Sequence, residues 1–193
     1  MSPLKWKLKR LLGSLNVGYA VPLSLEEKLW HLDHDAAWMT VNLPIDGHPD
    51  RVEEVLVEKV GDNRYRIASS PGMMQGLAAN DIIALDAQNS LGFQLLQRGT
   101  NVCIHVFCDA PQRDSIQAAL TRELGRIGGG LDGTMGQTGL CFTVPVAAGF
   151  SVIEGVLQRV VGEEWSYSNV YDPETGNPLN WWLKQSGNTE DNH

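Results

Sequence analysis

Two histidines and an aspartate near the start of the chain, His31, His34 and Asp35, have the residue types and spacing of metal ligands. On a helix, His31 and His34 at positions i and i+3 share one face, and Asp35 could join them at the helix end. A catalytic zinc usually takes a third protein ligand, and no HExxH motif or cysteine pair is present to help. We interpret the cluster as the polar end of a helix and expect no metal there. A metal-dependent enzyme using His31 and His34 is one alternative function.

Cys103 and His105 alternate along a predicted strand, 101–107, and therefore lie on the same face of its sheet. A cysteine beside a histidine is the pair used in nucleophilic catalysis, but nothing in the sequence supplies an orienting third group or lowers the pKa of the thiol. Val102, Ile104 and Val106 alternate with them and occupy the other face, under two predicted helices. We therefore expect His105 to be a buried histidine with its polar atoms satisfied, packed on the preceding β unit or on a partner.

The glycine-rich run at 128–133 (GGGLDG) formally matches the dinucleotide pattern GxGxxG. In dinucleotide-binding folds this pattern follows a strand and opens a helix, whereas here it follows a helix and leads into a hairpin. We interpret it as a flexible loop. The chain also contains no GKS or GKT phosphate loop and no GxSxG motif, and its lysines are scarce beyond the N-terminus. These observations favour a protein without catalytic activity or cofactor.

Aromatic side chains are concentrated in the last thirty residues of the predicted folded part. On a predicted strand at 165–171, Trp165, Tyr167 and Tyr171 share one face. Tyrosine and tryptophan are frequent in binding hot spots, and an acidic rim around them suits a basic protein partner. We expect Trp165 to lie in the core, and Trp181 and Trp182 at an interface. The predicted partner-binding residues are Trp181, Trp182, Tyr167, Tyr171, Glu163, Glu164, Asp172 and Glu174.

The charge of the chain is unevenly distributed. The net charge is −8, but the first ten residues carry four cations and no acid, so the remainder carries −12. An acidic body repels phosphate backbones and therefore argues against nucleic acid as the main partner. It would attract a basic protein surface, although solubility alone is an alternative explanation.

The first 35 residues form a predicted helical extension. An amphipathic helix at 6–15 has its leucines on one face and its cations on the other, and a capping box at 24–27 opens a second short helix. The first helix could make weak contact with an anionic membrane surface, dock on the protein, or act as a weak signal peptide; we favour docking or a basic tail. No stretch has the roughly 20 apolar residues of a membrane span. The three cysteines form no CxxC pair and favour a reducing cytoplasm.

The remaining pattern predicts an α+β protein with two units and a disordered tail at 185–193. Short strands with turns between them predict a small β-barrel-like unit over 36–99, with a short helix at 73–78. The order strand, helix, hairpin, helix, strand over 100–184 is that of a ferredoxin-like (β-α-β-β-α-β) unit with an aromatic C-terminal segment. The predicted elements of this second unit are a strand at 101–107, a helix at 112–127, strands within 131–136 and at 140–144, a helix at 150–161 and a strand at 165–171.

Three sequence runs carry a resemblance to a known family. The runs are Val57-Glu58-Lys59-Val60-Gly61-Asp62-Asn63-Arg64-Tyr65-Arg66-Ile67, then Ser70-Pro71, then Gly76-Leu77-Ala78-Ala79-Asn80-Asp81-Ile82-Ile83. Together they resemble a bacterial family known as domain of unknown function 4265, over roughly residues 38–171. The sequence departs from the family at Asn80, where Gly is expected. The resemblance implies a small β unit followed by a ferredoxin-like half, and it implies no catalytic residues.

These features favour a cytoplasmic protein that acts by binding and not by catalysis. In its most concrete form, the hypothesis is an immunity-type protein that neutralises a bacterial toxin domain by direct binding. A small-molecule-sensing regulatory module, with its ligand near 128–133, is a further alternative.

Overall fold

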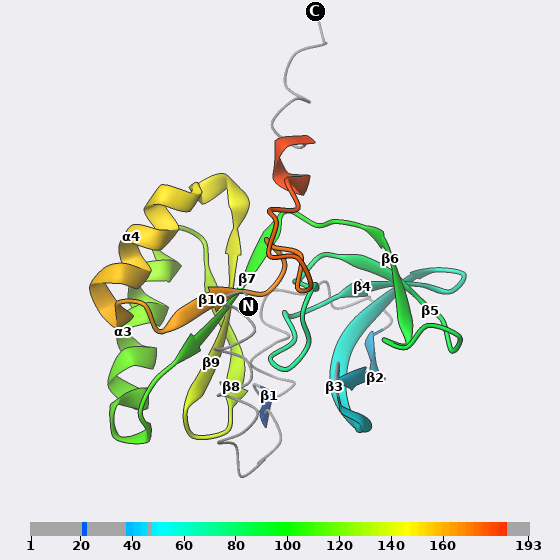
Figure 1. Cartoon of the computed structure of the whole chain (residues 1–193), viewed down its shortest axis with the longest axis horizontal. Helices are drawn as coiled ribbons and strands as arrows, with labels where there is room; N and C mark the ends of the chain where they lie inside the picture. The colour runs from blue at the N-terminus through cyan, green and yellow to red at the C-terminus, as the bar shows by residue number, and fades with distance from the viewer. Residues whose placement is uncertain (1–20, 23–37, 46–47, 185–193) are drawn as a thin grey trace, which may run out of the picture.

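The computed structural model describes residues 21–22, 38–45 and 48–184 and contains two antiparallel sheets and two α-helices (Figure 1). The predicted helical extension, with His31 and His34, lies outside the described residues apart from a short strand, β1 (Val21–Pro22). The predicted tail at 185–193 also lies outside them. Within the described residues, no helix has both the length and the apolar character needed to cross a membrane.

The first sheet is a meander whose five strands pair in chain order. Asn63, at a φ of 45°, forms the tight turn between its second and third strands, a left-handed position that asparagine tolerates well. The strands are β2 (Trp38–Ile45), β3 (His48–Gly61), β4 (Arg64–Ile67), β5 (Ile82–Leu85) and β6 (Phe93–Gln97).

The predicted barrel-like closure of this unit is not confirmed. In the described part of the chain the sheet is open, with β2 and β6 as its two edges. Its core face is covered instead by Met74 and Leu77 of the loop between β4 and β5, which pack against Val57 and Ile83. These side chains belong to the buried apolar cluster of the first unit. The predicted helix at 73–78 is also wrong, because this segment is irregular backbone with bends.

The second sheet has the strand order β1-β8-β9-β7-β10, and both helices cover one of its faces (Figure 1). The strand predicted within 131–136 is confirmed as β8. Of the predicted flexible loop at 128–133, Gly130 and Gly133 therefore belong to a paired strand, whereas Gly128 and Gly129 precede it. The elements are β7 (Asn101–Phe107), η1 (Ala110–Gln112), α3 (Arg113–Gly125), β8 (Gly130–Met135), β9 (Gly139–Pro145), η2 (Val146–Ala148), α4 (Phe150–Val161), β10 (Trp165–Tyr167) and η3 (Trp181–Lys184).

The closing strand β10 is shorter than the predicted 165–171, because the chain turns away after Tyr167 to bond with the first unit. The backbone of Ser168 still donates to the Cys103 carbonyl at 2.9 Å. Its hydroxyl, however, donates to the Met74 carbonyl at 3.1 Å, and its own carbonyl accepts from the N–H of Gly76 at 3.0 Å. Ser168 therefore connects the second sheet to the β4–β5 loop.

The alternation predicted along β7 is confirmed. Val102, Ile104 and Val106 are fully buried in the main core under the two helices. Cys103 and His105 point to the other face, which meets the first unit. This face carries the polar contacts between the units.

Candidate functional site

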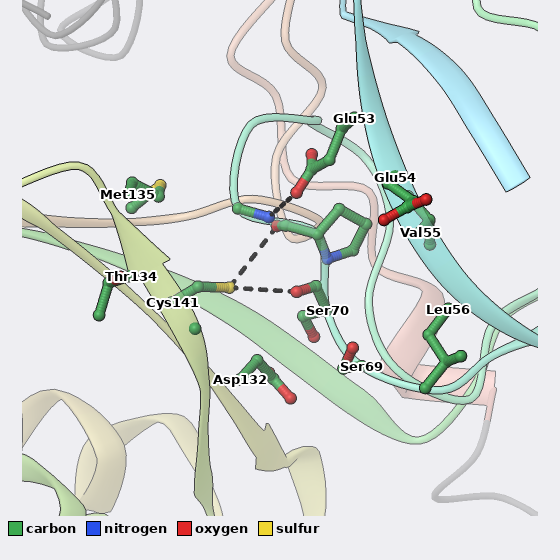
Figure 2. Close-up of a pocket in the computed structure, with 13 residues that line it drawn as sticks. Glu53, Glu54, Val55, Leu56, Ser69, Ser70, Asp132, Thr134, Met135 and Cys141 are labelled. Atoms are coloured by element: carbon green, nitrogen blue, oxygen red, sulfur yellow. Dashed lines mark hydrogen bonds between the residues drawn. The ribbon is translucent and has the colours of Figure 1, made fainter. Parts of the chain in front are cut away.

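The β4–β5 loop is held in place by one carboxylate from the first sheet. Glu53 of β3 accepts hydrogen bonds from the N–H groups of Gly72, Met73 and Met74 at 2.7, 2.9 and 3.1 Å. Burial raises the pKa of Glu53 above its usual value, and the N–H groups of Met73 and Gly72 offset part of the rise. The loop so anchored directs the Pro71 carbonyl toward the second sheet (Figure 2).

Cys103 and His105 of β7 and Cys141 of β9 form a buried cluster facing this loop, called here the cysteine–histidine cluster. His105 lies opposite Cys141 in the antiparallel register, and Cys103 is two residues away on the same face. The Cys103 sulfur lies 3.4 Å from Nε2 of His105 and 3.7 Å from the Cys141 sulfur. In chain order the three residues are 0%, 3% and 1% exposed, so the predicted burial of His105 is confirmed.

The electrostatics of the cluster favour a thiolate beside an imidazolium. Burial alone would raise the pKa of Cys103, but hydrogen bonding with Cys141 and the positive charge of His105 outweigh it and hold that pKa well below its usual value. Burial would lower the pKa of His105, but the Cys103 charge and hydrogen bonds to Cys103 and Pro71 raise it to about 9. The hydrogen bond with Cys103, followed by burial, raises the pKa of Cys141.

The Pro71 carbonyl supplies the third group that the sequence did not reveal. It lies 3.1 Å from Nε2 of His105. It also lies 3.5 Å from the Cys141 sulfur, a contact drawn in Figure 2. The structure therefore contains both features that the sequence did not reveal: the Pro71 carbonyl as the group that orients His105, and a lowered pKa of the Cys103 thiol. A nucleophile also needs access to its substrate, and Cys103 is fully buried. The arrangement accordingly suits a structural or ligand-holding role better than covalent catalysis.

A pocket lies directly beside the cluster, between β3, the β4–β5 loop and β8 (Figure 2). Cys141 lines it, whereas Cys103 does not. Three carboxylates, from Glu53, Glu54 and Asp132, give its wall an acidic character. Gly133 also lines the pocket. It is the last residue of the glycine-rich run at 128–133, near which a small-molecule-sensing module would bind its ligand. Its lining residues are Glu53, Glu54, Val55, Leu56, Ser69, Ser70, Pro71, Gly72, Asp132, Gly133, Thr134, Met135 and Cys141.

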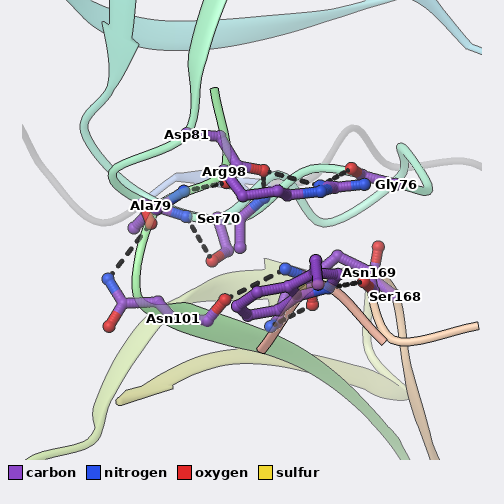
Figure 3. Close-up of polar contacts among 12 residues, drawn as sticks. Ser70, Gly76, Ala79, Asp81, Arg98, Asn101, Ser168 and Asn169 are labelled. Atoms are coloured by element: carbon purple, nitrogen blue, oxygen red, sulfur yellow. Dashed lines mark hydrogen bonds and ion pairs between the residues drawn. The ribbon is translucent and has the colours of Figure 1, made fainter. Parts of the chain in front are cut away.

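A second buried polar group, Asp81, organises the other end of the contact between the units (Figure 3). Its carboxylate accepts from the N–H groups of Ala78 at 3.0 Å and Gly99 at 2.7 Å, and from the Arg98 guanidinium at 2.9 Å. Burial raises the pKa of Asp81, and the charge of Arg98 opposes that rise. Arg98 also donates to the Gly76 carbonyl. This network joins the β4–β5 loop to residues 98–100, which lead from the first sheet into the second.

The backbone conformation explains why the sequence can have Asn80 where the family pattern has glycine. Asn80 has a φ of 71°, in the left-handed region where glycine is the default residue and asparagine the commonest substitute. Its backbone is so close to Gly99 that a Cβ on Gly99 would lie 2.6 Å from the Asn80 carbonyl carbon. The glycine expected at position 80 would meet the same conformational requirement, so the departure preserves the local fold.

Trp181, expected at an interface, lies in the core. It is 9% exposed, and its indole N–H donates to the Asn169 carbonyl at 2.7 Å. The guanidinium of Arg98 lies 6.0 Å from its ring centroid. The side chain of Asn169 in turn bonds Cys103 and Asn101 of β7 (Figure 3). The indole ring of Trp181 therefore faces inward, because its N–H group has a buried acceptor in the Asn169 carbonyl.

The other predicted aromatic contacts form one row of edge-to-face rings. Tyr167 is buried between Trp165, at 5.1 Å, and Phe150, at 5.5 Å. Trp182 packs on Phe150 at 5.0 Å and on Trp181 at 5.7 Å, and it stays half-buried. Trp165 packs against the core as expected, and Tyr171 is half-buried beside the same core.

The predicted acidic rim is only partly assembled. Glu163 and Glu164 are exposed, but they follow the C-terminal end of α4, whereas Trp182 packs at its N-terminal end. Twelve helical residues separate these ends by about 18 Å. Asp172 accepts hydrogen bonds within its own turn, from Glu174 and Thr175. Glu174 is exposed. The structure therefore does not bring Glu163 and Glu164 next to Trp182.

Comparison with known proteins gives a family without an assigned activity. A family model described as "Domain of unknown function (DUF4265)" matches residues 53–167. The chain is also similar to a solved structure described as a novel crystal structure of a hypothetical protein from Neisseria gonorrhoeae. The two are 22% identical over 70% of this chain and 94% of that chain, with a TM-score of 0.45. No curated protein matches the chain.

Proposed function

We propose that this chain, which belongs to the family of domain of unknown function DUF4265, is a non-catalytic protein that binds a basic protein partner. The observation that carries the proposal is an exposed apolar group at the C-terminal end of the fold, formed by Leu179, Trp182 and Leu183 and called here the C-terminal surface. Leu179 is 38% exposed and Leu183 is 61% exposed, beside the half-buried ring of Trp182. Grouped exposed apolar side chains of this kind are typical of interaction sites.

The charge around the C-terminal surface favours a basic partner. Residues 146–184, which include α4 and the C-terminal segment, contain five acidic residues and two cations, Arg159 and Lys184. Glu154 and Glu174 are exposed. Glu163 and Glu164 are also exposed, but they follow the opposite end of α4 and add only to the long-range field. An apolar patch on an acidic part of the molecule is complementary to a basic protein surface, and the long-range field would speed their encounter.

The proposal also includes a ferredoxin-like arrangement of the second unit. In the second sheet, β8, β9, β7 and β10 are neighbours in that order, with α3 and α4 on one face. This order supports a ferredoxin-like unit over 100–184 that joins the 36–99 unit at Gly99. Such a unit would present the C-terminal surface at one end of its two helices.

In its most concrete form the proposal is that of an immunity-type protein whose partner is a bacterial toxin domain encoded beside it. Expressing that neighbouring product in cells should then stop growth, and co-expressing this chain should restore it. A neighbouring product that is harmless, or that remains toxic in the presence of this chain, would remove the immunity form of the proposal and leave the binding form to the next experiment.

The binding proposal predicts that Leu183→Ala weakens partner capture at least about tenfold, because it removes the most exposed apolar side chain of the surface. The measurement is co-expression of the intact chain with the neighbouring gene product, followed by capture and quantification of the complex. Leu96→Ala is the matched control, since Leu96 is an exposed leucine (40%) on β6 of the other unit. Equal loss in both variants, or no complex with the intact chain, would contradict the proposed surface.

A further inference from the structure

We propose that Cys103, His105 and Cys141 bind one zinc ion, with the Pro71 carbonyl as the fourth ligand. This inference is independent of the proposed partner. It begins from the positions of the four donor atoms, which come from β7, β9 and the β4–β5 loop. The ligand atoms of the two cysteines and the histidine all lie within 4.8 Å of one another.

The separations of the donor atoms match the edges of a zinc tetrahedron. Zn–S bonds of about 2.3 Å and Zn–N and Zn–O bonds of about 2.0–2.2 Å give edges of roughly 3.8 Å for S–S, 3.6 Å for S–N and S–O and 3.4 Å for N–O. The Cys103 sulfur lies 3.7 Å from the Cys141 sulfur and 3.4 Å from Nε2 of His105. The Pro71 oxygen lies 3.8 Å, 3.5 Å and 3.1 Å from Cys103, Cys141 and His105 respectively. These five separations are close to their tetrahedral values, and the sixth, between the Cys141 sulfur and Nε2 of His105, is no more than 4.8 Å. An ion at the centre would draw the four donors slightly together.

The donor chemistry selects a soft or borderline ion. Two thiolates and one imidazole suit zinc, and they do not suit magnesium or calcium, which prefer oxygen ligands. Cys103 and Cys141 would bind as thiolates and His105 through neutral Nε2. Binding therefore releases the protons that the cluster holds in its metal-free form.

The neighbouring pocket provides a route for the ion. Cys141 lines the pocket, and the carboxylates of Glu53, Glu54 and Asp132 lie in its wall. Acidic walls raise the local concentration of cations. Glu53 also holds the loop that carries Pro71, so it would position the fourth ligand without touching the ion.

Two other arrangements of the cluster make different predictions. A Cys103–Cys141 disulfide would require the sulfurs to close from 3.7 Å to about 2.05 Å, and the product could not bind zinc as two thiolates. A purely hydrogen-bonded cluster would have no preference for zinc. The zinc centre differs from both in linking the first unit to the second sheet through the metal.

The test is titration of the full-length chain, reduced and stripped of metal, with Co²⁺ under anaerobic conditions. We expect saturation at one Co²⁺ per chain, with visible bands typical of tetrahedral cobalt and a near-ultraviolet thiolate-to-cobalt charge-transfer band that zinc abolishes. Zinc at a hundredfold excess over its Kd should also raise Tm by about 5–10 °C. Octahedral cobalt bands, no saturable binding, or a Cys103–Cys141 disulfide in protein isolated without reductant would overturn the proposal.

Cysteine and histidine variants locate the site. Cys141→Ser should lose most of the charge-transfer intensity and weaken binding by more than about 100-fold, since even outer contacts to a metal contribute tenfold to 100-fold. Cys108→Ser is the control, because Cys108 is the remaining free cysteine and is not part of the cluster. His105→Gln keeps both thiols and should retain charge transfer with weaker binding, which covers the case in which Cys141→Ser does not fold. Equal effects of Cys108→Ser and Cys141→Ser would contradict the assignment.

Discussion

Replacing Asp81 with Asn is expected to lower the free energy of unfolding by about 3–5 kcal/mol, the usual cost of removing one member of a buried charge pair. Asp81 is 0% exposed, and both of its carboxylate oxygens accept hydrogen bonds. An asparagine amide has one oxygen, so its NH2 group must face either the N–H of Gly99 or the donors of Ala78 and Arg98. At least one buried donor is then left without an acceptor.

Urea unfolding followed by tryptophan fluorescence measures this loss. Glu58→Gln is the matched control, because its pair with Arg66 is formed by side chains that are 21% and 43% exposed. Partly exposed pairs contribute about 1 kcal/mol or less. Similar losses in the two variants would show that Asp81 is no more important than a surface ion pair and would contradict its role in joining the units.

Trp181→Ala is the second large expected effect, at about 3–5 kcal/mol of unfolding free energy, because it empties a core position. The ring packs with the main core, and its N–H has a buried acceptor in Asn169. Trp182→Ala should cost less, about 1–2 kcal/mol, because its ring is half-buried and not fully buried. The same urea experiment, run on both variants, distinguishes the two roles.

The relative size of these two losses of unfolding free energy decides which tryptophan is the core residue. A larger loss for Trp182→Ala, or no loss for Trp181→Ala, would mean that Trp181 is not a core residue. The partner-capture assay gives the complementary measurement. Trp182→Ala should weaken capture under conditions in which urea unfolding shows that the variant is still folded.

Periodic patterns allowed much of the fold to be predicted from the sequence. The helix over 150–161 begins and ends where expected, between Gly149 and Gly162, which both have positive φ values. The alternation along 101–107 correctly assigned His105 to the face opposite the helices. These features depend on residues close together in the chain, for which spacing alone carries the information.

Contacts between distant segments could not be predicted in the same way. The Pro71 carbonyl is a backbone atom of a loop, so no residue type marks it as a neighbour of His105. Cys141 meets Cys103 only through the register of two strands that are far apart in the chain. Trp181 has the same residue type whether it lies in a core or at an interface, and its burial depends on the Asn169 carbonyl. The open first sheet likewise depends on loop side chains that cover its face.

Calorimetric titration of the intact chain with the neighbouring gene product, at low and at physiological salt, tests the proposed function most directly. We expect a one-to-one complex whose Kd increases with salt, because the partner is basic and the C-terminal part of this chain is acidic. We also expect the Kd of Leu183→Ala to be at least about tenfold higher than that of the intact chain, with Leu96→Ala unchanged. The absence of binding, or a Kd that responds to neither salt nor Leu183→Ala, would contradict the proposed binding function.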